Sequence, residues 1–209
     1  MSVAVISDIF GYIAVSCGFT MTSIQAVRVQ RRGPEGVSPL AWSLFLGSNT
    51  FFAIYGWANH YWPVAIGASL ISPIMLFIVI KTGWRHVATM VPLACAVTIL
   101  AAGVPVLIWD WQAGIPGAIA INIGLSIPAI LALYKSSSAQ GASATSWWIN
   151  GTATFLLTIS AALRKDWVFA GAQFLVCLSN LTIASLTVQR HHRLQRTAAS
   201  TKSDAAAAS

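Results

Sequence analysis

The sequence predicts an all-α integral membrane protein with seven transmembrane helices, arranged as two parallel three-helix repeats joined by a linker helix. This prediction rests on three observations: a low charge content, seven apolar runs of bilayer-spanning length, and an internal repeat. Only 8% of the residues are charged and 56% are hydrophobic, whereas soluble domains have about 25% charged residues. The mean hydropathy is +0.72. Because so few charges cannot cover a water-facing surface, the surplus apolar surface is expected to face lipid.

Seven apolar segments have the length of a transmembrane helix. A hydrocarbon core about 30 Å thick requires roughly 20 apolar residues per helix, and turn sequences separate the segments. No basic residue precedes the first segment, so we expect a spanning helix there and not a cleaved signal peptide. The tail at 190–209 is basic and then rich in Ala and Ser, and we expect it to be disordered. The predicted spans are 5–27, 39–58, 62–80, 87–108, 114–134, 146–163 and 166–188.

The basic residues predict the orientation of the chain. Seven spans place alternate loops on opposite sides, and short loops rich in Lys and Arg stay in the cytoplasm. We therefore expect the N-terminus outside and the C-terminus in the cytoplasm of a cell membrane, plasma or inner. This distribution explains the net charge of +7 without a nucleic-acid partner. One set of loops holds only Arg164 and Lys165, and the other, with the tail, holds Arg28, Arg31, Arg32, Lys81, Arg85, Lys135, Arg190, Arg193, Arg196 and Lys202.

The chain aligns with itself when it is shifted by 105 residues. The repeated pattern is Gly-x-Ser-x-x-x-Trp, followed twenty residues later by a second Trp. Its two copies are Gly36, Ser38, Trp42 and Trp62, and Gly141, Ser143, Trp147 and Trp167.

The repeat divides the chain into a first three-helix unit at 5–80 and a second at 114–188. An odd number of spans per unit would invert the second copy, and a linker helix at 87–108 restores its orientation. We therefore expect parallel repeats, an arrangement that transporters use, with the site on the axis between them near mid-membrane.

With both repeats in place, residues 5–188 resemble the SWEET and PQ-loop transporter superfamily. The resemblance implies the three-one-three helix layout and the passage of a mono- or disaccharide by alternating access. The oligomeric state is left open, and a homo-oligomer is one alternative to a single chain. Half-size sugar carriers of this family have Trp and Asn where this chain has Phe52 and Ala68, and, in the second repeat, Leu157 and Gln173. The family's first-helix proline is present as Pro128, and Ser23 stands at its place in the first repeat. The motifs are Ile24-Gln25, Arg31-Arg32, Gly36-x-Ser38, Tyr55-Gly56 and Trp62-Pro63, then Pro128, Lys135-Ser136, Gly141-x-Ser143 and Trp167.

The ionisable residues argue against pumping and against catalysis. Proton-coupled carriers need an ionisable relay inside the membrane, and a membrane enzyme needs an acid–base pair or a metal cluster. Neither pattern occurs inside the predicted spans, so we expect downhill facilitation, with no cofactor, no metal and no enzyme activity. The acids and histidines at helix ends, in loops or in the tail are Asp8, Glu35, Asp110, Asp166, Asp204, His60, His86, His191 and His192.

Uncharged polar and aromatic residues inside the spans are the candidates for a solute site. The alternative role of such residues is helix–helix hydrogen bonding. The candidates with groups that can hydrogen-bond to hydroxyls are Asn49, Asn122, Asn150, Ser160, Gln173 and Asn180. Gln173 and Asn180 are seven residues apart and so share a helix face.

Two aromatic residues and two hinge positions complete the predicted site. Phe52 and Tyr55 are three residues apart, so they share a helix face on which a sugar ring can stack, and the Tyr55 hydroxyl could close a gate. Gln25 and Pro128 are the predicted hinge or gate residues, and Asn122 is expected to contribute less. The alternative functions are an amino-acid carrier of PQ-loop type and a non-transporting receptor or assembly factor on the same fold.

Overall fold

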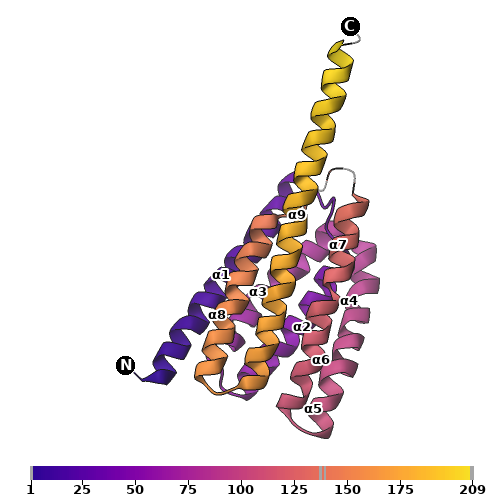
Figure 1. The fold of residues 1–209 in the computed structure, drawn as a ribbon. Coiled ribbons are helices and arrows are strands. Elements are labelled where there is room, and N and C mark those ends of the chain that lie inside the picture. The colour runs from indigo at the N-terminus through magenta and orange to yellow at the C-terminus, as the bar shows by residue number, and fades with distance from the viewer. Residues whose placement is uncertain (1, 137, 139, 208–209) are drawn as a thin grey trace.

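The computed structural model describes residues 2–136, 138 and 140–207, and this part of the chain is all-helical, without strands (Figure 1). The helices follow the predicted spans closely, and the largest shifts are at the ends of the first and last helices. Their bounds are α1 Val3–Arg32, α2 Pro39–Ala58, α3 Trp62–Thr82, α4 Trp84–Thr98, the π-helix η1 Ile99–Gly103, α5 Val104–Ile108, α6 Trp111–Gly124, α7 Ser126–Lys135, α8 Ala144–Leu163 and α9 Trp167–Ala207.

Five helical stretches of the described chain are long and apolar enough to cross a membrane. They indicate an all-α, multi-pass membrane protein. The helices α2 and α8 have the predicted length, but polar residues lower their hydropathy and they fall outside this set. The five stretches are Val3–Arg32, Trp62–Thr82, Trp84–Ile108, Trp111–Lys135 and Trp167–Thr197.

The repeated Gly-x-Ser loops start α2 and α8. Ser38 accepts a hydrogen bond from the amide of Ala41 at 3.1 Å, and Ser143 accepts one from the amide of Ser146 at 3.2 Å. Each serine therefore caps the first turn of its helix. Pro39 follows Ser38 at the first helical position, where a missing N–H costs nothing.

Prolines account for the two interrupted helices. Pro105 has no N–H for the carbonyl of Ala101, and the π-helix η1 surrounds that carbonyl. Pro128 likewise leaves the carbonyl of Gly124 without its partner, and α6 ends at Gly124 before α7 resumes at Ser126. Each interruption lies within a single membrane-length run, so the predicted spans 87–108 and 114–134 each contain more than one helical element.

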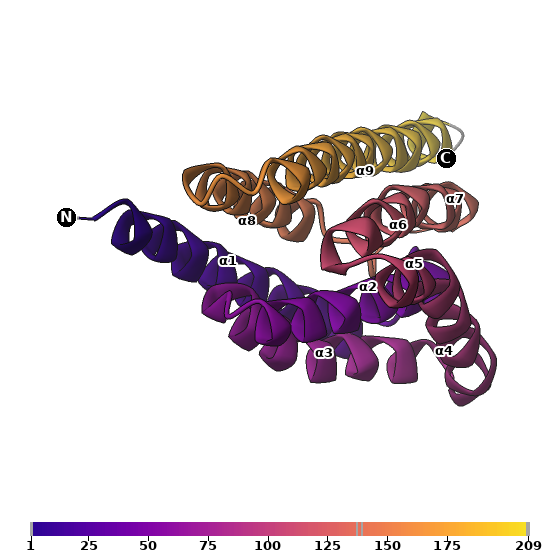
Figure 2. The same cartoon turned by 90° about the horizontal axis from the view of Figure 1, so that it is seen from below.

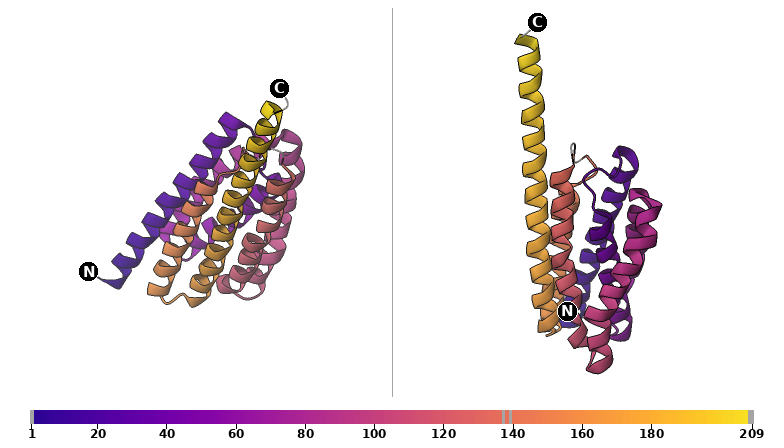
Figure 3. Two further views of the ribbon diagram at one scale, coloured as in Figure 1. Left: turned by 45° about the horizontal axis from the view of Figure 1, so that its top comes forward. Right: turned by 90° about the vertical axis from the view of Figure 1, so that its right-hand side faces the viewer.

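The helices pack in the same order in the two halves of the chain. In the first half α3 packs against both α1 and α2, and in the second half α9 packs against α8 and against α6 and α7. Between the halves, α1 packs against α8, and α2 packs against α6 and α7. Figure 2 shows this arrangement end-on, with α4 at the side of α2 away from α9. Figure 3 shows the same helices from two further sides.

Glycines allow the α4–η1–α5 run to approach its neighbours closely. A Cβ atom on Gly47 of α2 would lie 2.5 Å from the hydroxyl oxygen of Thr98. A Cβ atom on Gly117 of α6 would overlap the carbonyl oxygen of Ala101. Small residues at such contacts let membrane helices pack backbone to backbone.

The tail that the sequence predicts to be disordered is described as a continuation of α9. From residue 190 the chain continues as helix to Ala207 (Figure 1), and residues 208–209 lie outside the described residues. The reason is composition, because 190–207 contains no Gly or Pro and is rich in Ala, the strongest helix former.

Candidate functional site

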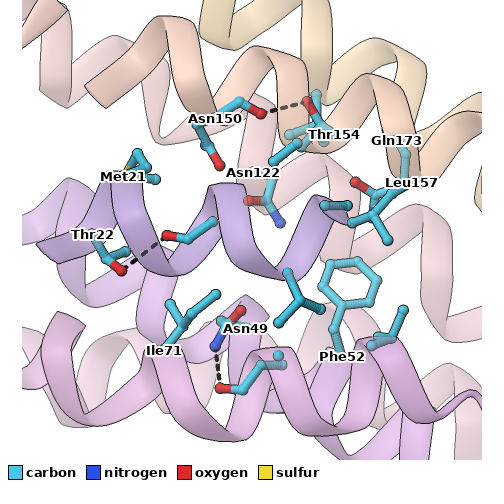
Figure 4. A pocket seen from close by; sticks show the side chains of 18 of the residues that line it. Met21, Thr22, Asn49, Phe52, Ile71, Asn122, Asn150, Thr154, Leu157 and Gln173 are labelled. Carbon is cyan, nitrogen blue, oxygen red and sulfur yellow. Dashed lines mark hydrogen bonds between the residues drawn. The ribbon is translucent and has the colours of Figure 1, made fainter. Parts of the chain in front are cut away.

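A cavity of about 100 Å³ lies between the first-half helices α1, α2 and α3 and the second-half helices α6, α8 and α9 (Figure 4). Most of its wall is apolar, and the described residues that line it include no charged side chain and no histidine. The cavity therefore suits a neutral solute, because an ion would lose its hydration without a compensating charge.

The repeat relates the two sides of the cavity. Six lining residues from α2 and α3 each have a counterpart 105 positions later, on α8 or α9, that also lines the cavity. Equivalent positions of the sequence repeat therefore line one cavity, from α2 and α3 on one side and from α8 and α9 on the other. The first set is Phe45, Asn49, Phe52, Val64, Ala68 and Ile71, and the second is Asn150, Thr154, Leu157, Phe169, Gln173 and Val176.

Three of the predicted site residues line this cavity. Asn49 lies on α2, and its amide donates to the carbonyl of Ala68 at 2.8 Å and to the hydroxyl of Ser72 at 2.9 Å. Phe52 also lies on α2, with its ring edge-on to Phe169 at a centroid distance of 5.6 Å. Gln173 enters from α9, and its side chain is 5% exposed.

Three others lie outside the cavity. Tyr55 lies one helical turn or less beyond Phe52 on α2, and Ser160 lies one turn or less beyond Leu157 on α8. Both make hydrogen bonds beyond the cavity. Asn180 shares a face with Gln173, but seven residues correspond to about 10 Å of helix rise, which carries it past the cavity. The amide nitrogen of Asn180 is buried, and in the described part of the chain it has no hydrogen-bond partner.

Asn122 and Asn150, two further polar candidates inside the spans, also line the cavity. Asn122, expected to contribute less, is 6% exposed on α6, and its amide nitrogen donates to the carbonyl of Ala118 at 3.0 Å. Asn150 of α8 is also 6% exposed and faces the cavity (Figure 4). In the repeat register Asn150 is the counterpart of Phe45, which lies one turn before Asn49 and two turns before Phe52 on α2.

A polar network joins the two halves of the chain beyond one end of the cavity, which we name the Asp166 end. The Tyr55 hydroxyl donates to the Asp166 carboxylate at 2.7 Å, joining α2 to the start of α9. Ser7 and Ser160, both fully buried, each donate to the other's carbonyl at 2.8 Å, joining α1 to α8. These bonds connect the first half of the chain to the second.

Arg164 and Tyr61 extend the network at the Asp166 end. Arg164 donates to the Ser7 hydroxyl at 3.1 Å, forms an ion pair with Asp8, and lies over the Tyr61 ring at 4.2 Å from its centroid. The Tyr61 hydroxyl is 2.6 Å from that of Ser160. Burial raises the pKa of Tyr61, so its hydroxyl stays protonated and can donate to Ser160.

Hydrogen bonds from α1 and the first Gly-x-Ser loop to the second Gly-x-Ser loop lie beyond the opposite end, which we name the Gly141 end. Gln25 of α1, a predicted gate residue, donates to the carbonyl of Gly141 at 2.7 Å. The amide of Gly141 donates to the carbonyl of Glu35 at 2.8 Å, and Arg28 donates to the carbonyl of Gln140 at 2.7 Å. These bonds also cross between the halves of the chain.

A pair of tryptophans lies inside the Gly141 end. Trp42 and Trp147 are equivalent in the repeat, and their ring centroids are 6.2 Å apart. Pro128, the other predicted hinge residue, lies half-buried in α7 just after the break between α6 and α7. It therefore lies next to the break in the helical run that supplies Asn122 to the cavity.

Comparison of the chain with protein-family models, with curated proteins and with solved structures gives no match.

Proposed function

We propose that this protein is a membrane transporter that lets a small neutral solute cross the bilayer downhill by alternating access. The observation that carries the proposal is the cavity between the two halves of the chain, lined by equivalent residues of both. In this proposal the helices form two parallel three-helix repeats, α1–α3 and α6–α9, with α4–η1–α5 as the linker. The two units rock against each other about the axis through the cavity.

Alternating access requires a closure on each side of the site that can open while the other stays closed. The hydrogen bonds at the Asp166 end and at the Gly141 end join the two halves on either side of the cavity. Each closure consists of a few polar contacts, which water can replace when that end opens. In the proposed orientation the Asp166 end faces outward and the Gly141 end faces the cytoplasm of the cell.

The uncharged lining favours facilitated diffusion of a neutral solute. An amino acid would bring charged groups into a cavity whose described lining residues offer none in return. The resemblance to SWEET proteins makes a mono- or disaccharide the starting expectation. A receptor or assembly factor has no need of an open space between its repeats, and the cavity therefore favours transport.

Uptake into proteoliposomes tests this proposal. The purified protein is tested with radiolabelled glucose, sucrose, glycerol, erythritol and several amino acids, and vesicles without protein supply the background. We expect protein-dependent uptake of a neutral solute that stops at the external concentration, with or without a pH gradient. Background rates for every solute would refute the proposal, and accumulation abolished by a protonophore would refute its downhill character.

A further inference from the structure

The two sides of the cavity differ in polarity although the repeat relates their positions. On α2 and α3 of the first half, Phe45 and Ala68 occupy positions where α8 and α9 of the second half have Asn150 and Gln173. The second half adds a third amide, Asn122 of α6. The polar groups therefore lie mainly on one wall, opposite an apolar wall that includes Phe52.

The amides on the polar wall are available to a solute. The side chains of Asn150 and Gln173 line the cavity and, within the described residues, make no hydrogen bond to protein. Asn122 uses its nitrogen on its own helix, which leaves its carbonyl oxygen as an acceptor.

Asn49, by contrast, is the one amide on the first-half wall among the described lining residues, and it is already engaged. Both of its donors are used, on Ala68 and Ser72. A solute therefore finds free donors and acceptors at the second half of the chain and mostly hydrocarbon at the first.

The volume of the cavity limits the size of its occupant. A protein cavity of about 150 Å³ accommodates benzene, and this cavity measures about 100 Å³. A hexose has about twice as many non-hydrogen atoms as benzene, so it exceeds this volume by a wide margin. Glycerol has as many non-hydrogen atoms as benzene and erythritol has two more, so a molecule of three or four carbons fits the cavity better than a hexose does.

We propose that the transported solute is a short polyol of three or four carbons, of the size of glycerol or erythritol. This inference rests on the proposed transport function. The hydroxyls of the solute contact Asn122, Asn150 and Gln173, and its C–H face contacts Phe52. The polar wall holds it in a single orientation relative to the two halves of the chain.

A size series tests the solute class. Stopped-flow light scattering measures the swelling of proteoliposomes in glycerol, erythritol, xylitol, glucose and sucrose, each against vesicles without protein. We expect protein-dependent flux for glycerol and erythritol and a fall of at least tenfold at the hexose. Faster flux of glucose or sucrose than of erythritol would overturn the polyol inference and leave the transport function standing. Background flux for all five solutes would refute both.

A swapped pair of substitutions tests the orientation. Gln173→Ala combined with Ala68→Gln keeps the number of amides and moves one across the axis to the apolar wall. We expect the erythritol flux to fall about tenfold, as in Gln173→Ala alone, because the other two amides stay on the second half. Wild-type flux in the swapped variant would overturn the single orientation. If the swapped variant does not fold, Gln173→Ala alone supplies the test, because it only removes atoms from the cavity wall. Wild-type flux in Gln173→Ala would show that the solute does not depend on the Gln173 amide and would overturn the proposed orientation.

Discussion

Replacing Tyr55 by Phe should open the Asp166 end more often. The substitution deletes only the hydroxyl that donates to Asp166 at 2.7 Å, and the ring of Tyr55, 3% exposed, keeps its packing. A hydrogen bond to a charged group contributes about 1.5–3 kcal/mol. If the bond exists only while this end is closed, its loss shifts the open-to-closed ratio by roughly tenfold to a hundredfold.

The assay is the reaction of a cysteine inside the cavity with an impermeant methanethiosulfonate reagent added outside. Ala68→Cys supplies the cysteine, because Ala68 lines the cavity, and Cys17, Cys95 and Cys177 are first replaced. The labelling rate should rise by the factor given above in Tyr55→Phe. The control is Tyr12→Phe, which alters an exposed tyrosine on α1. Equal labelling rates with and without the Tyr55 hydroxyl would refute its role in closing this end.

Three further predictions concern packing, topology and energetics. Gly117→Ala should lower the free energy of unfolding by about 1–3 kcal/mol, because the new methyl group overlaps the backbone of η1. The control is Gly171→Ala, whose methyl group meets open space and should not lower the free energy of unfolding. Thermal unfolding in detergent compares the two variants. Cysteines placed at His60 and Asp110 should react with an impermeant reagent from outside, and one at Gln140 only after the membrane is permeabilised; the reverse pattern would invert the topology. A pH gradient across sealed vesicles should change neither the direction nor the endpoint of transport, and accumulation that a protonophore abolishes would show coupling.

Hydropathy predicts the helices of this protein well, because each span must satisfy its backbone hydrogen bonds inside the lipid. The span predicted at 62–80 begins at the first residue of α3, Trp62, and ends two residues before its last, Thr82. The tail is the exception. Its charged and small residues indicate exposure to water, but they do not prevent a helix, and α9 continues to Ala207.

The repeat register relates only some of the helices that line the cavity. The loop at 136–143 is two residues longer than the loop at 33–38, so the shift of 105 relates α2 and α3 to α8 and α9 but not α1 to α6. Phe52 and Gln173 come from the related helices, and both line the cavity. Asn122 comes from α6, just before a break that sequence periodicity does not reveal.

Two residues on the same face of a helix need not both reach the cavity. Asn180 lies on the face of Gln173 but two turns beyond it, and Tyr55 lies one turn or less beyond Phe52. A cavity of about 100 Å³ spans only a few turns, so residues on the correct face still fall outside it.

The most direct test of the account asks whether the solute passes through the cavity between the two halves of the chain. Ala68→Cys, in protein without its native cysteines, is modified with the small reagent methyl methanethiosulfonate, and the flux of erythritol and of glucose is measured in proteoliposomes. A protein that retains only Cys95, which is exposed on α4, is the control. We predict that modification at position 68 abolishes the protein-dependent flux, that dithiothreitol restores it, and that the control is unaffected. Undiminished flux through protein that mass spectrometry shows to be fully modified at position 68 would contradict the account.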